Sequence, residues 1–356
     1  MKLFKPRHSP IGLEFSSASL RAAQLERRGP DWTLRDAFEL PRLEPHRPIS
    51  AQEAWRLAQV ICRRDFVGSA AVVALPNQQL IRGLIEVATP TATAQAPNPM
   101  LAAAQEIERH HGLEPGSYEL AAWLPPPTSD RRRTAVCVAG CTHAVAAPVL
   151  DALTAAGLDP RVLDSRACAA ARLSPTQPGA APLTAAIDLE ADDAELVLFH
   201  QQNVVYQRPL IDAGLDHAAR RLTDRGLDAD TARYALCRLG LNDLQTPHGQ
   251  RVGQTLRAFA KHLAQEARPA LDYAARLYPE LPIKSFTLVG DGAAVPGLAY
   301  EVRQRLLLDH APTRSAAFMN ASGTTRTHPG PSADAADAFA VALGLALHPE
   351  ETAWAA

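Results

Sequence analysis

The alternation of hydrophobic and polar positions predicts two strand hairpins, one in each half of the chain. In residues 11–25 an apolar run ends at Glu14, a small polar corner follows, and a second apolar run begins. In residues 183–209 an apolar run ends at Asp188, a polar corner follows, and two more runs are rich in β-branched and aromatic residues. Such runs between turn-forming residues are typical of strands. Two hairpins of the same form, each ending in an acid, predict a duplicated fold that faces a cleft.

The segment after the first hairpin is predicted to hold a strand at 32–40, a helix at 51–64 and a buried strand at 66–75. Ser50 and Glu53 match a capping box, in which each side chain binds the backbone N–H of the other residue at a helix start. A hairpin, a strand, a helix and a strand, in this order, are expected of one half of a duplicated α/β domain.

Residues 80–138 change character and predict an inserted subdomain in the first half. The predicted elements are a strand at 80–87, a loop at 89–99, a helix that Asn98 and Pro99 begin and that ends at His111, and strands at 118–124 and 133–139. The expected domains are therefore 1–79 with 139–182 as the first half, 80–138 as the insertion, and 183–356 as the second half.

The second half is predicted to be mainly helical after its hairpin. A long helix at 250–277 contains Pro269, where a kink is expected. The other predicted elements are helices at 215–225 and 229–239, a strand at 286–289, a turn at Gly290, Asp291 and Gly292, a helix from Pro296, a loop at 320–332 and a closing helix at 333–347.

Composition excludes several classes of function. The 356 residues carry a net charge of −2 and no long block of one sign, so no nucleic-acid partner is expected. No apolar run approaches the ~18 residues of a transmembrane helix, and the N-terminus lacks the apolar core of a signal peptide. We therefore expect a cytoplasmic protein that reaches a membrane only through a partner.

The cysteines are expected to be reduced thiols. There are five, an odd number. Cys137 and Cys141, with His143 nearby, suggest a metal site, but a strand at about 3.3 Å per residue separates the two sulfurs too far to share a zinc ion. We expect buried thiols there instead.

The two acids and the glycine turn follow each other as in actin-like nucleotide-binding proteins. In that fold acids at two hairpins hold magnesium through water, corner N–H groups contact the phosphates, and a glycine-rich turn holds the adenosine. Glu14, Asp188 and the turn at 290–292 stand in this order. The order predicts an α/β, actin-like (ribonuclease H-like) fold of duplicated domains around a central cleft.

The detailed motifs resemble the PilM family, actin-like cytoplasmic proteins of type IV pilus assembly that are related to the division protein FtsA. The family pattern IGIDIGSSSVKAVEL is similar to IGLEFSSASLRAAQL here, and LVDIGAEVTDL is similar to AIDLEADDAEL. The adenosine segment LTGGGALLPGL is similar to LVGDGAAVPGL, and the resemblance extends over nearly the whole chain.

The resemblance implies ATP and Mg²⁺ as cofactors, with Glu14 and Asp188 as the metal-binding residues. It also implies a partner, the short cytoplasmic N-terminal tail of a PilN-like bitopic inner-membrane protein, in a groove that residues 80–138 help to form; self-association is a further expectation. The implied cofactor-binding residues are Glu14, Ser16, Ser17, Asp188, Glu190, Gly290, Asp291 and Gly292.

This chain departs from the family at each of the three motifs, which predicts a degenerate nucleotide site. Glu14 replaces an aspartate, and Ser16, Glu190 and Asp291 replace glycines that let backbone approach phosphate; Ala194 replaces a threonine. A carboxylate at Glu190 also brings like charge toward the phosphates. Asp291 lies nearer the sugar, where it could accept a hydrogen bond from a ribose hydroxyl.

Several alternatives stay open. Glu14 and Asp188 either bind magnesium indirectly or cap their turns; Glu190 is either a catalytic acid or, as favoured here, a solvated corner charge; and Arg21 is expected at the surface. No residue is nominated as catalytic. The favoured function is an assembly scaffold of a type IV pilus or related secretion system, and the alternative is an active Mg-ATP switch or weak ATPase.

Overall fold

The structure, a computed structural model, describes residues 7–29, 31–88, 98–130, 132–174, 181–242, 245–311, 313–320 and 333–349. It divides into two compact units. Unit 1 comprises Met1–Leu80, Thr142–Leu173 and Thr313–Ala356, and unit 2 comprises Ile81–Cys141 and Ser174–Pro312. The loop predicted at 320–332 lies, except for its first residue, outside the described residues.

Unit 1 is built on one mixed sheet of order β1-β3-β2-β5-β9, with β4 also paired to β3. The β2–β3 hairpin is antiparallel, whereas β2 pairs in parallel with β5, and β5 with β9. All five residues of β2 are buried, as expected of a central strand covered on both faces. The strands are β1 (Arg7–His8), β2 (Ile11–Phe15), β3 (Ser19–Arg28), β4 (Asp31–Pro41), β5 (Ala70–Ala74) and β9 (Asp159–Asp164).

The helices of unit 1 include the predicted capped helix. The capping box of Ser50 and Glu53 is present at the start of α1, so that prediction is confirmed. β5 starts later than predicted, because Gly68 takes a left-handed turn at φ +76° before it. The helical elements are α1 (Ala51–Arg63), η1 (Asn77–Gln79), α3 (His143–Ala155), α4 (Arg166–Ala171), α9 (Ser315–Asn320), η3 (Ala333–Phe339) and α10 (Ala340–Ala346).

The apolar helix α10 lies directly on the central strand of unit 1. A Cβ atom at Gly12 of β2 would lie 2.0 Å from the backbone oxygen of Ala342, so only glycine permits this approach. All residues of α10 are buried. A segment from the end of the chain thus completes the core around a strand from its beginning.

Unit 2 contains a five-stranded sheet of order β12-β11-β10-β13-β14. As in unit 1, a central strand pairs antiparallel with its hairpin partner and parallel with a later strand: β10 with β11 and β13. This repeated pattern confirms the predicted duplication. The strands are β10 (Leu183–Leu189), β11 (Ala194–His200), β12 (Asn203–Leu210), β13 (Ile283–Val289) and β14 (Asp309–His310).

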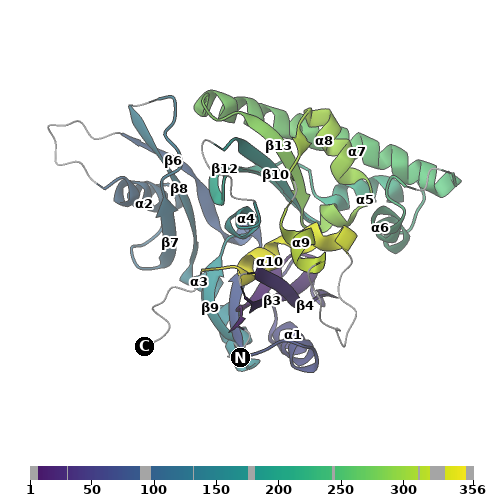
Figure 1. Cartoon of the computed structure of the whole chain (residues 1–356), viewed down its shortest axis with the longest axis horizontal. Coiled ribbons are helices and arrows are strands. Elements are labelled where there is room, and N and C mark those ends of the chain that lie inside the picture. The colour runs from purple at the N-terminus through teal and green to yellow at the C-terminus, as the bar shows by residue number, and fades with distance from the viewer. Residues whose placement is uncertain are drawn as a thin grey trace. The chain divides into compact units, whose positions relative to one another are not determined.

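Helices pack on this sheet to form the larger core of unit 2. The long helix α7 begins three residues earlier than predicted, where Thr246 caps it and Pro247 opens it, and it continues through Pro269. Figure 1 shows α7 as the longest ribbon of the unit. The helical elements are α5 (Leu215–Thr223), α6 (Ala229–Arg238), α7 (Pro247–Leu277), η2 (Asp291–Ala294) and α8 (Leu298–Leu306).

The segment predicted as an insertion forms a small sheet of order β6-β8-β7 with one helix, α2. It belongs to unit 2 by its contacts: Arg82 pairs with Glu195 at 2.7 Å, and the Trp123 indole N–H donates to the Val204 carbonyl at 2.7 Å. Asn98 caps α2 as predicted. The elements are β6 (Ile81–Ala88), α2 (Pro99–His111), β7 (Tyr118–Trp123) and β8 (Arg133–Thr142).

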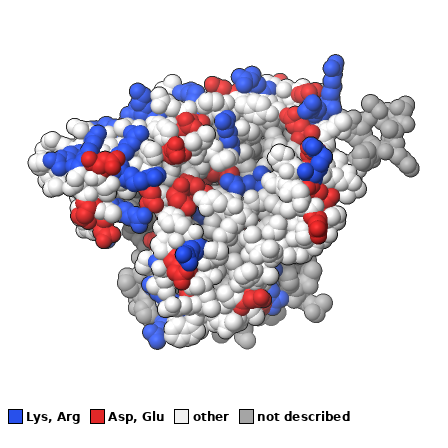
Figure 2. All heavy atoms as spheres, turned by 180° about the vertical axis from the view of Figure 1, so that it is seen from behind, with Lys and Arg blue, Asp and Glu red and all other residues white. Residues whose placement is uncertain are grey.

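On the face in Figure 2, acidic and basic side chains are interspersed. Among the residues that the structure describes, no helix has the length and apolar character needed to cross a membrane.

Candidate functional site

The acid of the first hairpin is enclosed by arginines. Glu14 is the last residue but one of β2 and is fully buried; Arg21 lies directly opposite it on β3 and donates to its Oε1 at 3.0 Å. Arg166 from α4 contacts the same oxygen at 2.9 Å, and Arg21 also binds Glu39 at 2.9 Å. Arg21 is 2% exposed, so its expected place at the surface is wrong.

This cluster changes what Glu14 can do chemically. Two buried guanidinium groups already compensate the negative charge of buried Glu14, where interactions between charges are strong, whereas Glu39 is 46% exposed. Mg²⁺ prefers oxygen ligands and would meet two fixed cations at this carboxylate. The arrangement suits a buried ion-pair cluster and does not fit a magnesium ligand.

At the corner after β2, two backbone N–H groups are already bonded within the corner itself. The Ser16 hydroxyl accepts from the N–H of Ser19 at 2.9 Å and from that of Ala18 at 3.3 Å. The Ser16 carbonyl accepts from Arg42 at 2.8 Å, and that of Ser17 accepts from the His46 N–H at 3.1 Å. In an actin-like site such corner N–H groups face the phosphates, and here the side chain that replaces glycine takes two of them.

Arg42 fixes this corner to helix α1. Its guanidinium makes two hydrogen bonds to the Glu53 carboxylate, at 2.7 and 3.0 Å, and both side chains are buried. Burial by itself raises the pKa of Glu53, but Arg42 and the backbone N–H groups of Ser50 and Leu43 outweigh it, so the pKa lies below its ordinary value. Glu53, the acid of the α1 capping box, therefore also holds Arg42 against the first corner.

The second hairpin and the glycine turn come together in unit 2. Asp188 is the last residue but one of β10; it lies opposite Glu195 of β11 and beside Val289 of β13, which leads into Gly290. Gly290 has φ +76° and ψ −159°, a conformation open essentially to glycine alone. A Cβ atom there would lie 2.4 Å from Glu190 Oε1 and 2.8 Å from Asp188 Oδ1. Both carboxylates therefore pack against the bare Cα of Gly290.

Glu190 is buried rather than solvated, being 3% exposed. Its backbone is tied down on both sides, since its N–H donates to the Asp193 carbonyl at 2.9 Å and its carbonyl accepts from the Leu215 N–H at 2.9 Å. The expected solvated corner charge is wrong. Asp188 is equally buried. Of the two, Glu190 stands where phosphate-binding backbone is expected, and its carboxylate would bring like charge toward a polyphosphate.

The remaining predicted residues complete this turn. A Cβ at Gly292 would meet the Leu189 side chain at 2.4 Å, so the turn packs closely on the second hairpin. Asp291 begins the short helix η2. The structure thus brings Asp188, Glu190 and the turn at 290–292 together in unit 2, while Glu14, Ser16 and Ser17 lie together in unit 1.

Arg166, Arg42 and Glu53 are the site residues that the sequence interpretation missed. The hairpin register could have placed Arg21 opposite Glu14, because cross-strand partners follow from the turn. Nothing in the sequence links Arg166, on a helix far along the chain, to Glu14. Only the fold of unit 1 brings the two together.

Cys137 and Cys141 are both buried on β8, as predicted. Among the described residues, no group of three or more His, Cys, Asp and Glu side chains is placed to hold a metal ion. Burial, with the nearby Asp164 carboxylate, raises the pKa of Cys168 to about 11, so this thiol stays protonated at neutral pH.

The two units have the duplicated α/β fold of actin-like proteins. A chain of the PilM-PilN type IV pilus biogenesis complex is similar, with a TM-score of 0.70 and 22% identity over 95% of this chain and 98% of that one. The ethanolamine utilization protein EutJ from Carboxydothermus hydrogenoformans is also similar, with a TM-score of 0.52 and 11% identity over 97% of this chain and 90% of that one. No protein-family model and no curated protein matches the sequence. At these identities the likeness shows the fold.

Proposed function

We propose that this chain is a PilM-like scaffold of a type IV pilus, or of a related secretion system. In this role it binds the cytoplasmic N-terminal tail of a PilN-like bitopic protein and reaches the inner membrane from the cytoplasm through that partner. The observation that carries the proposal is the similarity to a chain of the PilM-PilN complex over almost the full length of both chains.

The proposal includes a degenerate nucleotide site. Its support is local: Glu14 is bound by two arginines within 3.0 Å, Ser16 takes the N–H groups of its own corner, and Glu190 packs against Gly290. Each feature removes a different requirement of ATP binding. The arginines occupy the carboxylate that would hold magnesium, Ser16 takes backbone donors that would bind phosphate, and Glu190 adds negative charge at the turn. We therefore propose a scaffold without ATPase activity.

The second candidate is an active Mg-ATP switch. It is favoured by the retained glycine conformation at Gly290, which lies next to Asp188 as an adenosine turn requires. On this alternative, the carboxylates at 188 and 190 would have to rearrange when nucleotide enters.

Thermal melting with and without Mg-ATP separates the two candidates. A ligand at a hundred times its dissociation constant stabilises a protein by ~2.7 kcal/mol, which for a chain of this size is a shift of several degrees. We expect no shift at millimolar Mg-ATP, relative to Mg²⁺ alone. A clear upward shift would reject the degenerate site and support the switch.

Binding of the partner is tested by titrating the whole chain with a labelled peptide of the tail of the adjacent membrane protein. We expect saturable binding, and a sequence-scrambled peptide is the control. A folded sample that binds neither the peptide nor the full-length partner contradicts the scaffold role.

A further inference from the structure

Helix α7 carries a row of exposed cations. Arg251, Arg257, Lys261 and Arg268 are all exposed, and at 3.6 residues per turn they fall within about a third of the helix circumference. The apolar residues of α7 lie on the other side and pack into the core of unit 2. We call these four residues the α7 basic row. At 1.5 Å per residue, the row extends over about 25 Å of the helix.

No acid of α7 balances the α7 basic row. The helix contains two acids: Glu266 lies on another side of the helix, and Asp272 follows Arg268 by about one turn. Among the described residues, no carboxylate forms an ion pair with any member of the row. The four charges are therefore accessible to a ligand outside the chain.

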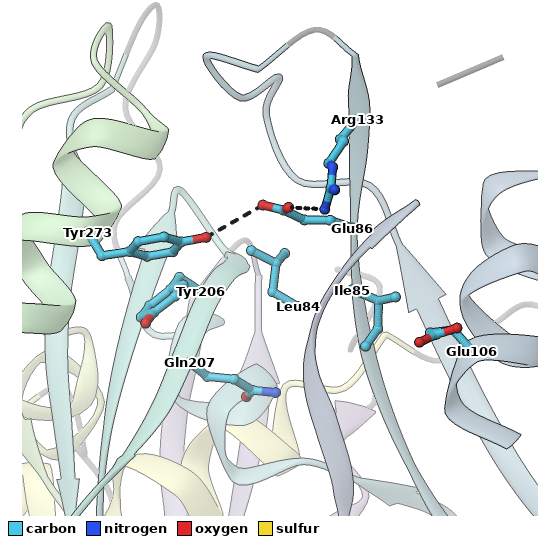
Figure 3. Close-up of a pocket in the computed structure, with 8 residues that line it drawn as sticks. All are labelled: Leu84, Ile85, Glu86, Glu106, Arg133, Tyr206, Gln207 and Tyr273. Carbon is cyan, nitrogen blue, oxygen red and sulfur yellow. Dashed lines mark hydrogen bonds and ion pairs between the residues drawn. The ribbon is translucent and has the colours of Figure 1, made fainter. Parts of the chain in front are cut away.

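Other exposed arginines of unit 2 are paired with acids. Examples are Arg109 with Glu106, Arg133 with Glu86 (Figure 3) and Arg233 with Asp216. Helix stability does not explain the difference, because Arg257 and Lys261 stand four residues apart, where like charges destabilise a helix. The row therefore costs α7 some stability, which indicates a role outside the helix.

Helix α5 adds cations beside the row. Arg225 donates to the Thr255 hydroxyl of α7 at 3.4 Å, which places the two helices side by side. Arg221, about one helical turn before Arg225, is exposed as well, and Asp224 is the exposed acid between them. The excess of positive charge thus extends from α7 onto α5.

We propose that the α7 basic row rests on the anionic phospholipid headgroups of the membrane at which the partner holds the chain. Its guanidinium and ammonium groups bind the headgroup phosphates, and this contact fixes which side of unit 2 faces the lipid. The inference adds a direct lipid contact to the proposed function, and rests on that function for the choice of a membrane as the anionic surface.

The chemistry of the row favours a lipid surface over an acidic protein segment. The other exposed residues on this side of α7 between Arg251 and Arg268 are Gln254, Ala258 and Gln265, and no exposed aromatic or large aliphatic side chain lies among them. Protein interfaces have a core that is poor in charge and rich in aromatic residues. An anionic membrane attracts each Lys or Arg separately and needs no such core.

The row orients the chain, whereas the partner recruits it. Near an anionic membrane each Lys or Arg strengthens binding about fivefold, and the attraction fades beyond the Debye length of about 10 Å at 0.1 M salt. A chain that is already held by a membrane partner has a high local concentration at the lipid, so a weak contact is enough to orient it.

The first test measures flotation of the whole chain with lipid vesicles in the absence of any partner. Vesicles of phosphatidylcholine with about a third phosphatidylglycerol should bind the chain at about 0.01 M salt, and binding should fall steeply toward about 0.15 M. Vesicles of pure phosphatidylcholine should not bind it. Equal binding to both kinds of vesicle, or binding to neither, overturns the proposal.

The second test locates the contact with a matched pair of double variants. Arg257→Gln with Lys261→Gln should weaken binding to the anionic vesicles about twentyfold. Arg47→Gln with Arg161→Gln removes the same charge from exposed positions of unit 1 and should bind like the wild type. Circular dichroism confirms that both fold. An equal loss in the two double variants assigns the effect to net charge and contradicts the role of the row.

Competition distinguishes a lipid surface from other anions. Inorganic phosphate or polyglutamate is added to the anionic vesicles at matched ionic strength, and neither should release the chain more than chloride does. Release by phosphate assigns a site for a single anion, and release by polyglutamate assigns an acidic protein segment. Either result overturns the lipid contact.

The outcomes separate this inference from the proposed function. No partner is present in the vesicle assays, so a failure there leaves the scaffold role standing. A chain that binds the anionic vesicles as expected but binds neither the tail nor the intact partner rejects the scaffold role and leaves the lipid contact standing.

Discussion

Single arginine side chains decide the chemistry of the first hairpin. Arg21 and Arg166 convert Glu14 from a predicted metal ligand into the centre of a buried ion-pair cluster. A buried cluster of this kind adds little net stability compared with apolar side chains, yet removing one partner is costly because the others stay buried and uncompensated. This asymmetry makes the cluster testable.

Glu14→Gln should destabilise the protein by about 3–5 kcal/mol, because two buried guanidinium groups lose their central anion. Glu106→Gln is the control, since its pair with Arg109 is exposed to solvent and should contribute little to stability. Urea unfolding followed by circular dichroism measures both. If Glu14→Gln unfolds like the control, the cluster is not the structural element described here.

Helix α1 shows how one element serves two purposes. Glu53 closes the capping box of the helix and also holds Arg42, which in turn binds the carbonyl of the first corner. Its pKa lies below the ordinary value of 4.5. A lowered pKa means that the folded state favours the charged form, so the stabilisation is complete above pH 4.5 and is lost as pH falls through the lower, folded-state pKa.

The stability difference between the wild type and Glu53→Gln should therefore depend on pH. We expect the variant to be less stable by about 3–5 kcal/mol at pH 7 and the difference to shrink on acidification below pH 4.5. Ser50→Ala should cost about 1 kcal/mol, with little change over the same range. Urea titrations at several pH values would show this, and a difference that grows on acidification would contradict the assignment.

The contact of α10 with β2 gives a second prediction about elements. Gly12→Ala places a methyl group against the helix backbone at Ala342, which cannot move away as a flexible side chain would. We expect a lower melting temperature, with a loss of at least about 1–3 kcal/mol. An unchanged melting curve would show that α10 does not pack closely on β2.

For the whole molecule, the distribution of thiols provides an independent check of the fold. Cys62 and Cys237 are exposed, Cys137 and Cys141 are buried, and Cys168 has a pKa of about 11. A thiol reagent such as DTNB should react quickly with two cysteines of the native protein and with all five in denaturant. Fast reaction of four or five native thiols would contradict the described packing.

The amino-acid sequence by itself determined the local elements and the duplicated plan. Hydrophobic alternation marked both hairpins, the Ser50 and Glu53 pattern marked the start of α1, and Asn98 and Pro99 marked α2, because strand alternation and helix capping depend on neighbours in the chain. The replaced glycines also predict altered backbone at both hairpin corners and at the glycine turn.

Tertiary structure alone decided the partners of those residues. Arg166 reaches Glu14 from a distant helix, the last helix α10 packs on the second strand, and residues 81–141 join unit 2 through contacts such as Arg82 with Glu195. Hydrophobic patterns in the sequence predict which side chains are buried, but they do not predict which cation pairs with a buried carboxylate. That choice is made only when segments far apart in the chain share one core.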